Sequence, residues 1–453
     1  MQTAINPATG QVISHHPTLS DEQMMLCIER AQHAYTEWST MSYAERGAIM
    51  HKVAAALRES KATLGQTMTD EMGKTVKEAG PEVEKAAWCA EHYADTAAQY
   101  LKDEDISSDA SRSFVHYQPL GVTLGVLPWN APLWVTFRYL APALMAGNTC
   151  VMKHDPHVPE CALGIIAAFE KAGAPADIVV NLPVTNGQVA QAIRHPAIKA
   201  VSFTGSAKAG ATVAALAAAE VKPSVLELGG SDPFIVLADA DLDHAADVAV
   251  LSRVINVGQS CIAAKRILIE APIYDDFVAR LLSRLKALNV GDPNNAETDV
   301  GPIARADLRD NLHRQVTTTI AQGAKCLLGG EMPEGEGFYY PVTLLADVTS
   351  EMCAMQQEVF GPVMSVSAVR DAKHAIEVAN ASAYGLGGGV WTQSAALAIE
   401  MAQALEVGQV AINGIVKTDP RLPSGGVKQS GYGRELGEHG IKAFVNAKQI
   451  WIK

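Results

Sequence analysis

The sequence predicts an α/β protein in which helices cover parallel sheets, and three observations support this fold class. Beyond about residue 118, short apolar runs alternate with stretches of helical periodicity, an order typical of parallel sheets with crossover helices. The length of 453 residues suits two or three domains better than one small core. Hydrophobic residues make up 48% and charged residues 19%, the balance of a globular chain that buries a large core.

The first hundred residues show the apolar spacing of helices. From Ala44 onward, apolar side chains recur at helical spacing with charged residues between them, and residues 86–100 continue the pattern. Residues 102–113 are polar, and residues 114–117 alternate as a short strand does. We therefore expect a helical N-terminal segment followed by a short strand.

The next hundred residues predict a parallel sheet. The expected strands are residues 121–127, 150–153, 178–182 and 200–204, and the expected helices between them are residues 134–145, 160–172 and 187–193. The alanine-rich run 209–219 is predicted to be a further helix.

The same alternation recurs after residue 230. Residues 234–237 are predicted as a strand and residues 241–257 as a helix with Asp241 at its N-cap, and further pairs follow to about residue 412. The last residues, 441–453, alternate weakly. Either a strand that pairs with another subunit or a strand on the chain's own sheet fits this pattern.

Composition excludes several classes of protein. The net charge of −13 argues against general binding to nucleic acid or to an anionic membrane. The N-terminus lacks a basic start followed by an apolar run, and no stretch approaches the roughly 18 unbroken apolar residues of a spanning helix. The seven cysteines form no CxxC pair, which disfavours a disulfide scaffold or a structural zinc site. We therefore expect a cytoplasmic protein without a metal, whose cysteines are free thiols.

Two of the predicted strands end in turns suited to ligand binding. Strand 200–204 runs into Gly205 and Ser206, and a glycine turn there directs the free N–H groups of the following helix at a phosphate. The sequence Pro-Trp-Asn follows strand 121–127, and the amide of Asn130 could donate to a developing oxyanion. Taken singly, each feature also fits an ordinary loop.

Three other residues have side chains suited to nucleophilic or acid–base chemistry. Cys261 follows glycine and small polar residues, and its thiolate would attack a carbonyl if its pKa were lowered. Glu227 lies at an otherwise apolar strand end, where burial raises the pKa of a carboxyl group and suits a general base. Glu358 stands beside an aromatic residue and a glycine turn. The alternatives are a buried structural cysteine and structural ion pairs.

Together these segments resemble the aldehyde dehydrogenase superfamily, and most of all its succinate-semialdehyde dehydrogenases. The resemblance rests on the order and spacing of PWN (128–130), FTGS (203–206), LELGG (226–230), GQSC (258–261) and EVFGP (358–362), with NPATG (6–10) before them and PSGGVKQSG (423–431) after them. It covers nearly the whole chain. It implies a Rossmann-like parallel-sheet cofactor domain, an α/β catalytic domain and a small β oligomerisation element.

The resemblance also implies domain boundaries and catalytic roles. The NAD(P)-binding domain would comprise residues 1–103 and 118–229, the catalytic domain 230–425, and the oligomerisation element with the C-terminal segment 104–117 and 426–453. Cys261 would attack the aldehyde, Asn130 and the Cys261 N–H would hold the oxyanion, and Glu227 would activate the water that hydrolyses the thioester. The expected assembly is a homodimer or a homotetramer.

The resemblance further implies that NAD or NADP is bound. Relatives selective for NAD often carry a glutamate three residues after the lysine that contacts the adenosine ribose. In this chain the lysine is Lys153 and the third residue after it is Pro156, so we expect use of both cofactors. The residues expected at the cofactor are Leu127, Pro128, Trp129, Lys153, Phe203, Gly205, Ser206, Leu228, Gly229, Glu358 and Phe360.

Arg138, eight residues after Asn130, bears on which aldehyde is oxidised. Succinate-semialdehyde dehydrogenases resemble this chain in placing an arginine there, where it could clamp a distal carboxylate through a charge-assisted hydrogen bond worth about 1.5–3 kcal/mol. The alternative is an arginine that pairs with a surface acid. Some such enzymes have a second arginine where this chain has Ile255, and the candidates to replace it are Arg253, Lys417, Thr418 and Arg421.

Three alternative functions stay open on the sequence alone. One is a broad-specificity aliphatic aldehyde dehydrogenase, in which Arg138 is incidental. Another is a coenzyme-A-acylating enzyme, against which the presence of Glu227 argues. The third is a non-catalytic descendant of the fold, against which the retained Cys261, Glu227 and Asn130 argue. Ala263 stands where some relatives carry a second cysteine, so we expect no disulfide switch.

Overall fold

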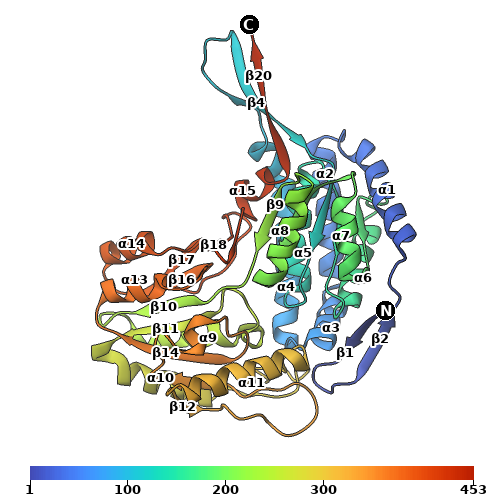
Figure 1. Ribbon diagram of the computed structural model, residues 1–453. Coiled ribbons are helices and arrows are strands. Elements are labelled where there is room, and N and C mark those ends of the chain that lie inside the picture. Colours follow the sequence, from blue (N-terminus) through green and yellow to red (C-terminus); the bar gives the residue numbers. More distant parts are fainter.

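The computed structural model describes residues 1–453 and contains two large sheets that lie side by side in the body of the molecule (Figure 1). A third, smaller sheet projects from this body and carries the C-terminus at its tip (Figure 1). None of the helices combines the length and the apolar character that crossing a bilayer requires.

The N-terminal segment begins with a strand pair, which differs from the helical segment expected there. Strand β1 (Gln2–Ile5) pairs antiparallel with β2 (Val12–His16). The turn between them is closed by the Gly10 N–H, which donates to the Asn6 carbonyl at 2.7 Å. The positive φ of Gly10, +73°, suits this turn. The expected helices follow as α1 (Asp21–Trp38), α2 (Tyr43–Glu59), α3 (Lys61–Met72) and α4 (Val76–Tyr100).

The first large sheet has six strands in the order β19-β9-β8-β5-β6-β7. Its strands are β5 (Val122–Val126), β6 (Thr149–Lys153), β7 (Val179–Asn181), β8 (Ile198–Thr204), β9 (Ser224–Glu227) and β19 (Gly431–Tyr432). Its helices are α5 (Pro132–Met145), α6 (Pro159–Lys171), α7 (Asn186–Arg194) and α8 (Ala207–Ala219). All pairs are parallel except β19 with β9, so the predicted parallel sheet is confirmed.

The second large sheet has seven strands in the order β12-β13-β14-β11-β10-β16-β17, parallel except for β12 with β13. Its strands are β10 (Asp232–Val236), β11 (Ala264–Glu270), β12 (Lys325–Leu328), β13 (Thr343–Ala346), β14 (Val363–Val369), β16 (Gly387–Trp391) and β17 (Gln409–Ile412). Its helices are α9 (Leu242–Val254), α10 (Tyr274–Lys286), α11 (Ala306–Ala321), α12 (Cys353–Gln356), α13 (Ala372–Asn380) and α14 (Ala395–Ala404).

Helix α9 begins as expected but ends earlier. The Asp241 side chain accepts a hydrogen bond from the His244 N–H at 3.1 Å, which confirms the predicted N-cap. The helix ends at Val254 rather than at residue 257. The reason is that Ile255 has an extended ψ of 132°, and Asn256 and Val257 then have φ values of +55° and +58°, in the left-handed region where a right-handed helix cannot continue.

The projecting sheet joins the C-terminus to the middle of the chain. Strand β20 (Val445–Ile452) pairs antiparallel with β4 (Arg112–Pro119) over eight residues, and β3 (Glu104–Asp105) pairs with the other edge of β4. The C-terminal strand thus lies on a sheet of its own chain, while its outer edge is free. The remaining short elements are β15 (Tyr384–Gly385), β18 (Val427–Lys428) and α15 (Gly437–Lys442).

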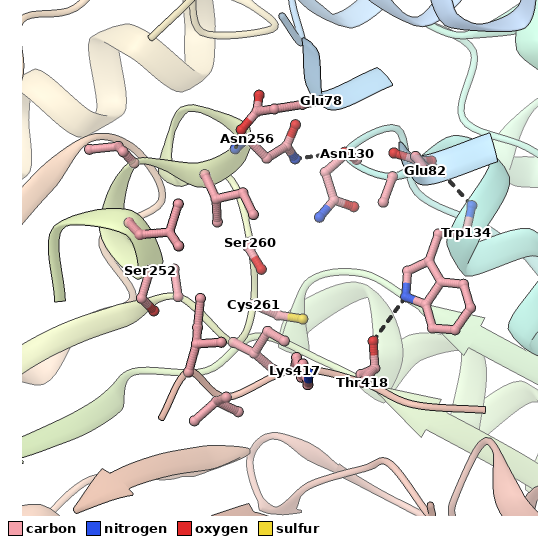
Figure 2. A pocket seen from close by; sticks show the side chains of 18 of the residues that line it. Glu78, Glu82, Asn130, Trp134, Ser252, Asn256, Ser260, Cys261, Lys417 and Thr418 are labelled. Atoms are coloured by element: carbon pink, nitrogen blue, oxygen red, sulfur yellow. Dashed lines mark hydrogen bonds between the residues drawn. The ribbon is translucent and has the colours of Figure 1, made fainter. Parts of the chain in front are cut away.

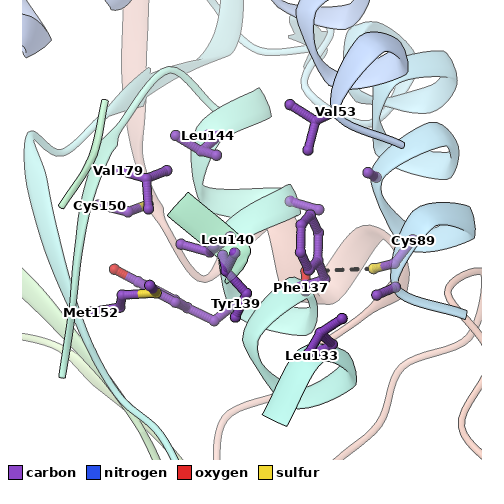
Figure 3. Close-up of a cluster of buried hydrophobic side chains, with 14 of the residues drawn as sticks. Val53, Cys89, Leu133, Phe137, Tyr139, Leu140, Leu144, Cys150, Met152 and Val179 are labelled. Atoms are coloured by element: carbon purple, nitrogen blue, oxygen red, sulfur yellow. Dashed lines mark hydrogen bonds between the residues drawn. The ribbon is translucent and has the colours of Figure 1, made fainter. Parts of the chain in front are cut away.

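Helix α5 is the most deeply buried helix and carries one side of the candidate site. All of its residues are buried, and Figure 3 shows Phe137, Leu140 and Leu144 packed among side chains of neighbouring elements. The ring of Phe137 stacks on Phe169 of α6, with 6.1 Å between centroids. A helix enclosed on all sides gives its polar residues fixed positions.

We predict that Phe137→Ala lowers the free energy of unfolding by about 3–5 kcal/mol, because it leaves a cavity at the centre of α5 packing. Chemical denaturation of the variant and the wild type measures the change. Leu163→Ala on α6, where the side chain is 45% exposed, is the matched control and should change the free energy of unfolding by about 0.5 kcal/mol or less. Equal effects of the two substitutions would contradict the prediction.

Candidate active site

The loop that carries Cys261 begins with a strained turn. Asn256 and Val257 both have positive φ, which is costly for a β-branched valine. The turn is held from α4, because the Asn256 N–H donates to Glu78 Oε1 at 2.8 Å. The Asn256 side chain donates to the Asn130 carbonyl at 2.7 Å (Figure 2). These bonds connect the Cys261 loop to the two helices on the other side of the site.

Lys265 fixes the backbone of the Cys261 loop from the protein interior. It is fully buried at the start of β11, and its Nζ donates to the carbonyls of Ser260 at 2.8 Å and Cys261 at 2.7 Å. Its ammonium also lies 3.7 Å from Glu358 Oε1. The Cys261 carbonyl is therefore turned toward the protein interior.

Asn130 lies two residues before α5, with its amide beside the loop. Its Nδ2 donates to the Gln259 carbonyl at 3.0 Å. A side-chain amide has two N–H groups, so one remains for a ligand. Asn130 and Cys261 line the same cavity, and Figure 2 shows both side chains extending into it. The predicted pairing of nucleophile and oxyanion donor is therefore geometrically available.

Glu227 ends β9 and is also part of the cavity wall. Burial and the neighbouring Glu435 raise the pKa of its carboxyl group to about 8, although Arg138 opposes the shift. Its Oε1 is buried and accepts no hydrogen bond from the protein. A Cβ at residue 425 would lie 2.6 Å from this oxygen, so Gly425 leaves the space that the carboxylate needs.

Arg138 reaches the cavity wall but is engaged by acids of the protein. Its Nε donates to Glu435 Oε2 at 2.5 Å, and its Nη2 lies 3.4 Å from Glu227 Oε2. All three side chains are almost fully buried. Arg138 therefore forms ion pairs within the protein, but its partners are buried and not the surface acid that the alternative expected. Nothing in the spacing of the sequence pointed to Glu435.

The environment of Cys261 keeps its thiol protonated. Burial raises the pKa of the thiol to about 11, while Arg138 and Lys265 oppose the shift. A thiol of this kind needs a base to become a nucleophile. Glu358 and Glu227 are the carboxyl groups whose charges act on this thiol, and of the two only Glu227 lines the same cavity.

The cavity has a volume of about 730 Å³, which suits a small organic substrate. Residues of α4, α5, the Cys261 loop and the segment 415–418 line it. Of the candidates for a second carboxylate ligand, Lys417 and Thr418 lie on its wall. Arg253 instead donates to backbone carbonyls inside the protein, and Arg421 pairs with Asp419 outside the cavity.

The residues expected to bind the cofactor lie at the carboxyl ends of the strands in the six-stranded sheet. Leu127, Lys153 and Gly205 follow the carboxyl ends of neighbouring parallel strands, the edge where open α/β sheets bind ligands. The rings of Trp129 and Phe360 meet edge to face, with 5.9 Å between centroids. The other expected residues at or facing these strand ends are Pro128, Phe203, Ser206, Leu228, Gly229 and Glu358.

Glu358 lies in the loop between α12 and β14 of the second sheet, and its side chain contacts the first sheet. Its Oε1 accepts a hydrogen bond from the Gly230 N–H at 3.0 Å. A Cβ at residue 229 would lie 2.1 Å from Glu358 Oε2, so only glycine allows this approach. The contact places a carboxylate from one sheet at the strand ends of the other.

The strand ends offer a cation that the protein leaves unpaired. Lys153 is buried, and burial lowers its pKa, yet its ammonium forms no ion pair or hydrogen bond. The Thr204 hydroxyl, at the end of β8, is buried without a partner. The carboxylate of Asp155 is occupied, because His157 Nδ1 lies 2.7 Å from it. These free polar groups fit the ribose and phosphate of a nicotinamide cofactor.

The chain is similar to known proteins over its whole length. A sequence model of the aldehyde dehydrogenase family matches residues 1–450. A Synechocystis protein named as a probable NADP(+) succinate-semialdehyde dehydrogenase is 45% identical over 99% of both chains. The Mycobacterium avium NADP(+) succinate-semialdehyde dehydrogenase is 44% identical, over 99% of this chain and 96% of the other. The crystal structure of the Streptococcus pyogenes succinic semialdehyde dehydrogenase with NADP+ superposes with a TM-score of 0.98 and 36% identity over 100% of both chains.

We predict that alkylation of Cys261 by iodoacetamide accelerates about tenfold per pH unit and reaches no plateau below pH 10, because only the thiolate reacts and the pKa is about 11. The rate is followed by mass spectrometry of the labelled peptide. Cys261→Ser protein corrects for labelling of the exposed Cys326. A plateau near pH 9 would show an ordinary thiol instead.

Proposed function

This chain belongs to the aldehyde dehydrogenase family, and we propose that it oxidises succinate semialdehyde to succinate with NADP as the hydride acceptor. The observation that carries the proposal is a single cavity that holds Cys261, Asn130 and Glu227 together with cationic side chains. In the balanced overall reaction, the aldehyde, water and NADP+ give the carboxylic acid, NADPH and a proton.

The first step is attack by Cys261 on the aldehyde carbon. The proton of the thiol must leave, because the pKa of about 11 keeps it bound at neutral pH, and Glu227 in its ionised form is the acceptor on the cavity wall. The oxyanion that forms takes the free N–H of Asn130 and the backbone N–H of Cys261. Loss of one such donor costs about 2.7–4 kcal/mol of transition-state stabilisation.

The second step is loss of hydride from the hemithioacetal, which leaves a thioester on Cys261. When bound, NAD(P) supplies the hydride acceptor. In this chain, Lys153 would hold the adenosine ribose, and Glu358 would hold the nicotinamide ribose. The hydrogen bond from the Gly230 N–H and the nearby Lys265 ammonium hold the Glu358 carboxylate in place, which supports that role.

The third step is hydrolysis of the thioester. Glu227 must first release to solvent the proton that it took from Cys261, which is the proton in the overall balance. A water molecule near Glu227 can then donate to its unpartnered Oε1 and attack the acyl carbon as the carboxylate takes its proton. Arg138 stabilises the ionised form of Glu227, and Glu435 opposes it. A base in this position supports water, not a thiol cofactor, as the acyl acceptor.

NADP is favoured over NAD by the groups around Lys153. Pro156 brings no carboxylate to the position where relatives selective for NAD carry one, and Asp155 is occupied by His157. A 2′-phosphate would therefore meet the unpaired ammonium of Lys153 without a free opposing charge. The relatives named for NADP(+) support the same preference.

We also propose an assembly and a location for the protein. The free edge of β20, with Trp451 and Ile452 about half exposed, offers a surface on which a second copy could complete a homodimer or homotetramer. The abundance of free thiols supports a reducing compartment such as the cytoplasm.

We expect kcat/KM for succinate semialdehyde to exceed that for butyraldehyde at least tenfold, because the two differ chiefly in the distal carboxylate that a cationic cavity attracts. NADPH or NADH formation at 340 nm, run with each aldehyde and each cofactor, measures this. Equal use of both aldehydes would favour the broad-specificity alternative. Turnover only in the presence of coenzyme A would favour the acylating one.

A further inference from the structure

Lys85 is a cation in the cavity that no part of the protein neutralises. It lies on α4 and forms no ion pair, whereas the other α4-side lysines of the cavity are paired: Lys74 with Glu82, and Lys77 with Asp299 at 2.7 Å. Its ammonium lies 4.2 Å from the centroid of the Trp134 ring. Lys417, also on the cavity wall, is exposed to solvent.

The acids nearest to Lys85 are already engaged elsewhere. Glu82 holds Lys74, and its Oε1 also accepts from the N–H groups of Leu133 and Trp134 at the start of α5. Asp419 is bound by Arg421 at 2.7 Å. Burial and the nearby Arg138 therefore lower the pKa of Lys85 to about 8, against the pull of these acids. An incoming anion would relieve this repulsion.

Thr418 completes a donor pair with Lys85. Its Oγ1 accepts hydrogen bonds from Lys85 Nζ at 2.9 Å and from Trp134 Nε1 at 3.1 Å (Figure 2 shows the second). Both lone pairs of the hydroxyl are thus used, so its own hydrogen is left to donate. Thr418 is buried on the cavity wall, and an acceptor for that hydrogen has to come from the cavity.

Arg138 is less available to a substrate than Lys85. Its guanidinium already forms ion pairs with Glu435 and Glu227. Arg138 therefore has carboxyl partners inside the protein, whereas the ammonium of Lys85 contacts only the Thr418 hydroxyl and the Trp134 ring. A cation without a carboxylate partner thus lies beside Thr418 on the cavity wall.

We propose that Lys85, together with the Thr418 hydroxyl, binds the distal carboxylate of the substrate and so determines the preference for an acidic aldehyde. This inference rests on the proposed function. One carboxylate oxygen accepts from the Lys85 ammonium and the other from the Thr418 O–H. Arg138 then stabilises the ionised form of Glu227, and Lys85 discriminates between acidic and uncharged aldehydes.

The test compares succinate semialdehyde with butyraldehyde in the wild type and in Lys85→Met, which keeps the apolar stem against Trp134. We expect KM for succinate semialdehyde to rise about ten- to a hundredfold, the worth of one charge-assisted hydrogen bond, with kcat little changed. Values for butyraldehyde should change less than about threefold. Lys85→Arg should restore most of the preference. Lys61→Met, which removes a cation paired with Glu84 outside the cavity, is the control.

Different outcomes separate the inference from the proposed function. If the wild type shows no preference for succinate semialdehyde, the proposed substrate and this inference both fall. If the wild type prefers it and Lys85→Met keeps the preference, only the role of Lys85 is overturned. The same holds if Lys417→Met, and not Lys85→Met, abolishes the preference. If Lys85→Met lowers kcat/KM equally for both aldehydes, its role is structural, and the inference is wrong.

Discussion

The candidate site depends on a buried cluster of one guanidinium and two carboxyl groups. Arg138 comes from α5, Glu227 from the end of β9, and Glu435 from the segment after β19. Strand β19 pairs with β9 so that Gly431 lies opposite Glu227, which brings Glu435 close to the base. Removing one partner of a buried ion pair commonly costs about 3–5 kcal/mol, because the other charge is left without compensation. The cluster therefore ties distant parts of the chain together and sets the charge of the base.

The same surroundings hold both reacting groups neutral before substrate arrives. Burial raises the pKa of Cys261 to about 11 and that of Glu227 to about 8. The nucleophile is therefore present as a thiol at neutral pH, which limits its oxidation, since the thiolate is the form that reacts with oxidants. The backbone around it is fixed by Lys265, Asn256 and Asn130. The backbone around Cys261 is thus fixed before the substrate binds, while the thiolate and the carboxylate form only during the reaction.

Local pattern and motif order predicted much of this arrangement. The strands and helices between residues 121 and 219 lie where apolar spacing placed them, and Asp241 caps α9. The N-terminal strand pair was not predicted, because its two strands are short and carry no strong alternation. The early end of α9 depends on the extended Ile255 and the left-handed Asn256 and Val257. Asparagine often adopts the left-handed region, but the β-branched Ile255 and Val257 do not indicate a turn.

The residues that act on one another across the chain were the hardest to predict. Cys261, Glu227 and Asn130 were identified from motifs, and they line one cavity. Glu435 bonds to a residue 297 positions away, and Lys85 meets Thr418 across 333 positions. Contacts of this kind follow from the packing of α4 and α5 against the C-terminal segments. The position of Arg138 predicted a side chain free to bind a substrate carboxylate. Its partners Glu435 and Glu227 could be identified only from the structure.

The most direct test of the account is the pH dependence of thioester hydrolysis. Rapid quench and intact mass spectrometry would follow the loss of the acyl group from Cys261 in the wild type and in Glu435→Gln. We expect a wild-type rate that falls as the pH drops through about 8, since the base must be ionised, and a profile moved to lower pH in Glu435→Gln, since Glu435 raises the pKa of Glu227. A pH-independent rate, or a variant profile that coincides with the wild type, would contradict it.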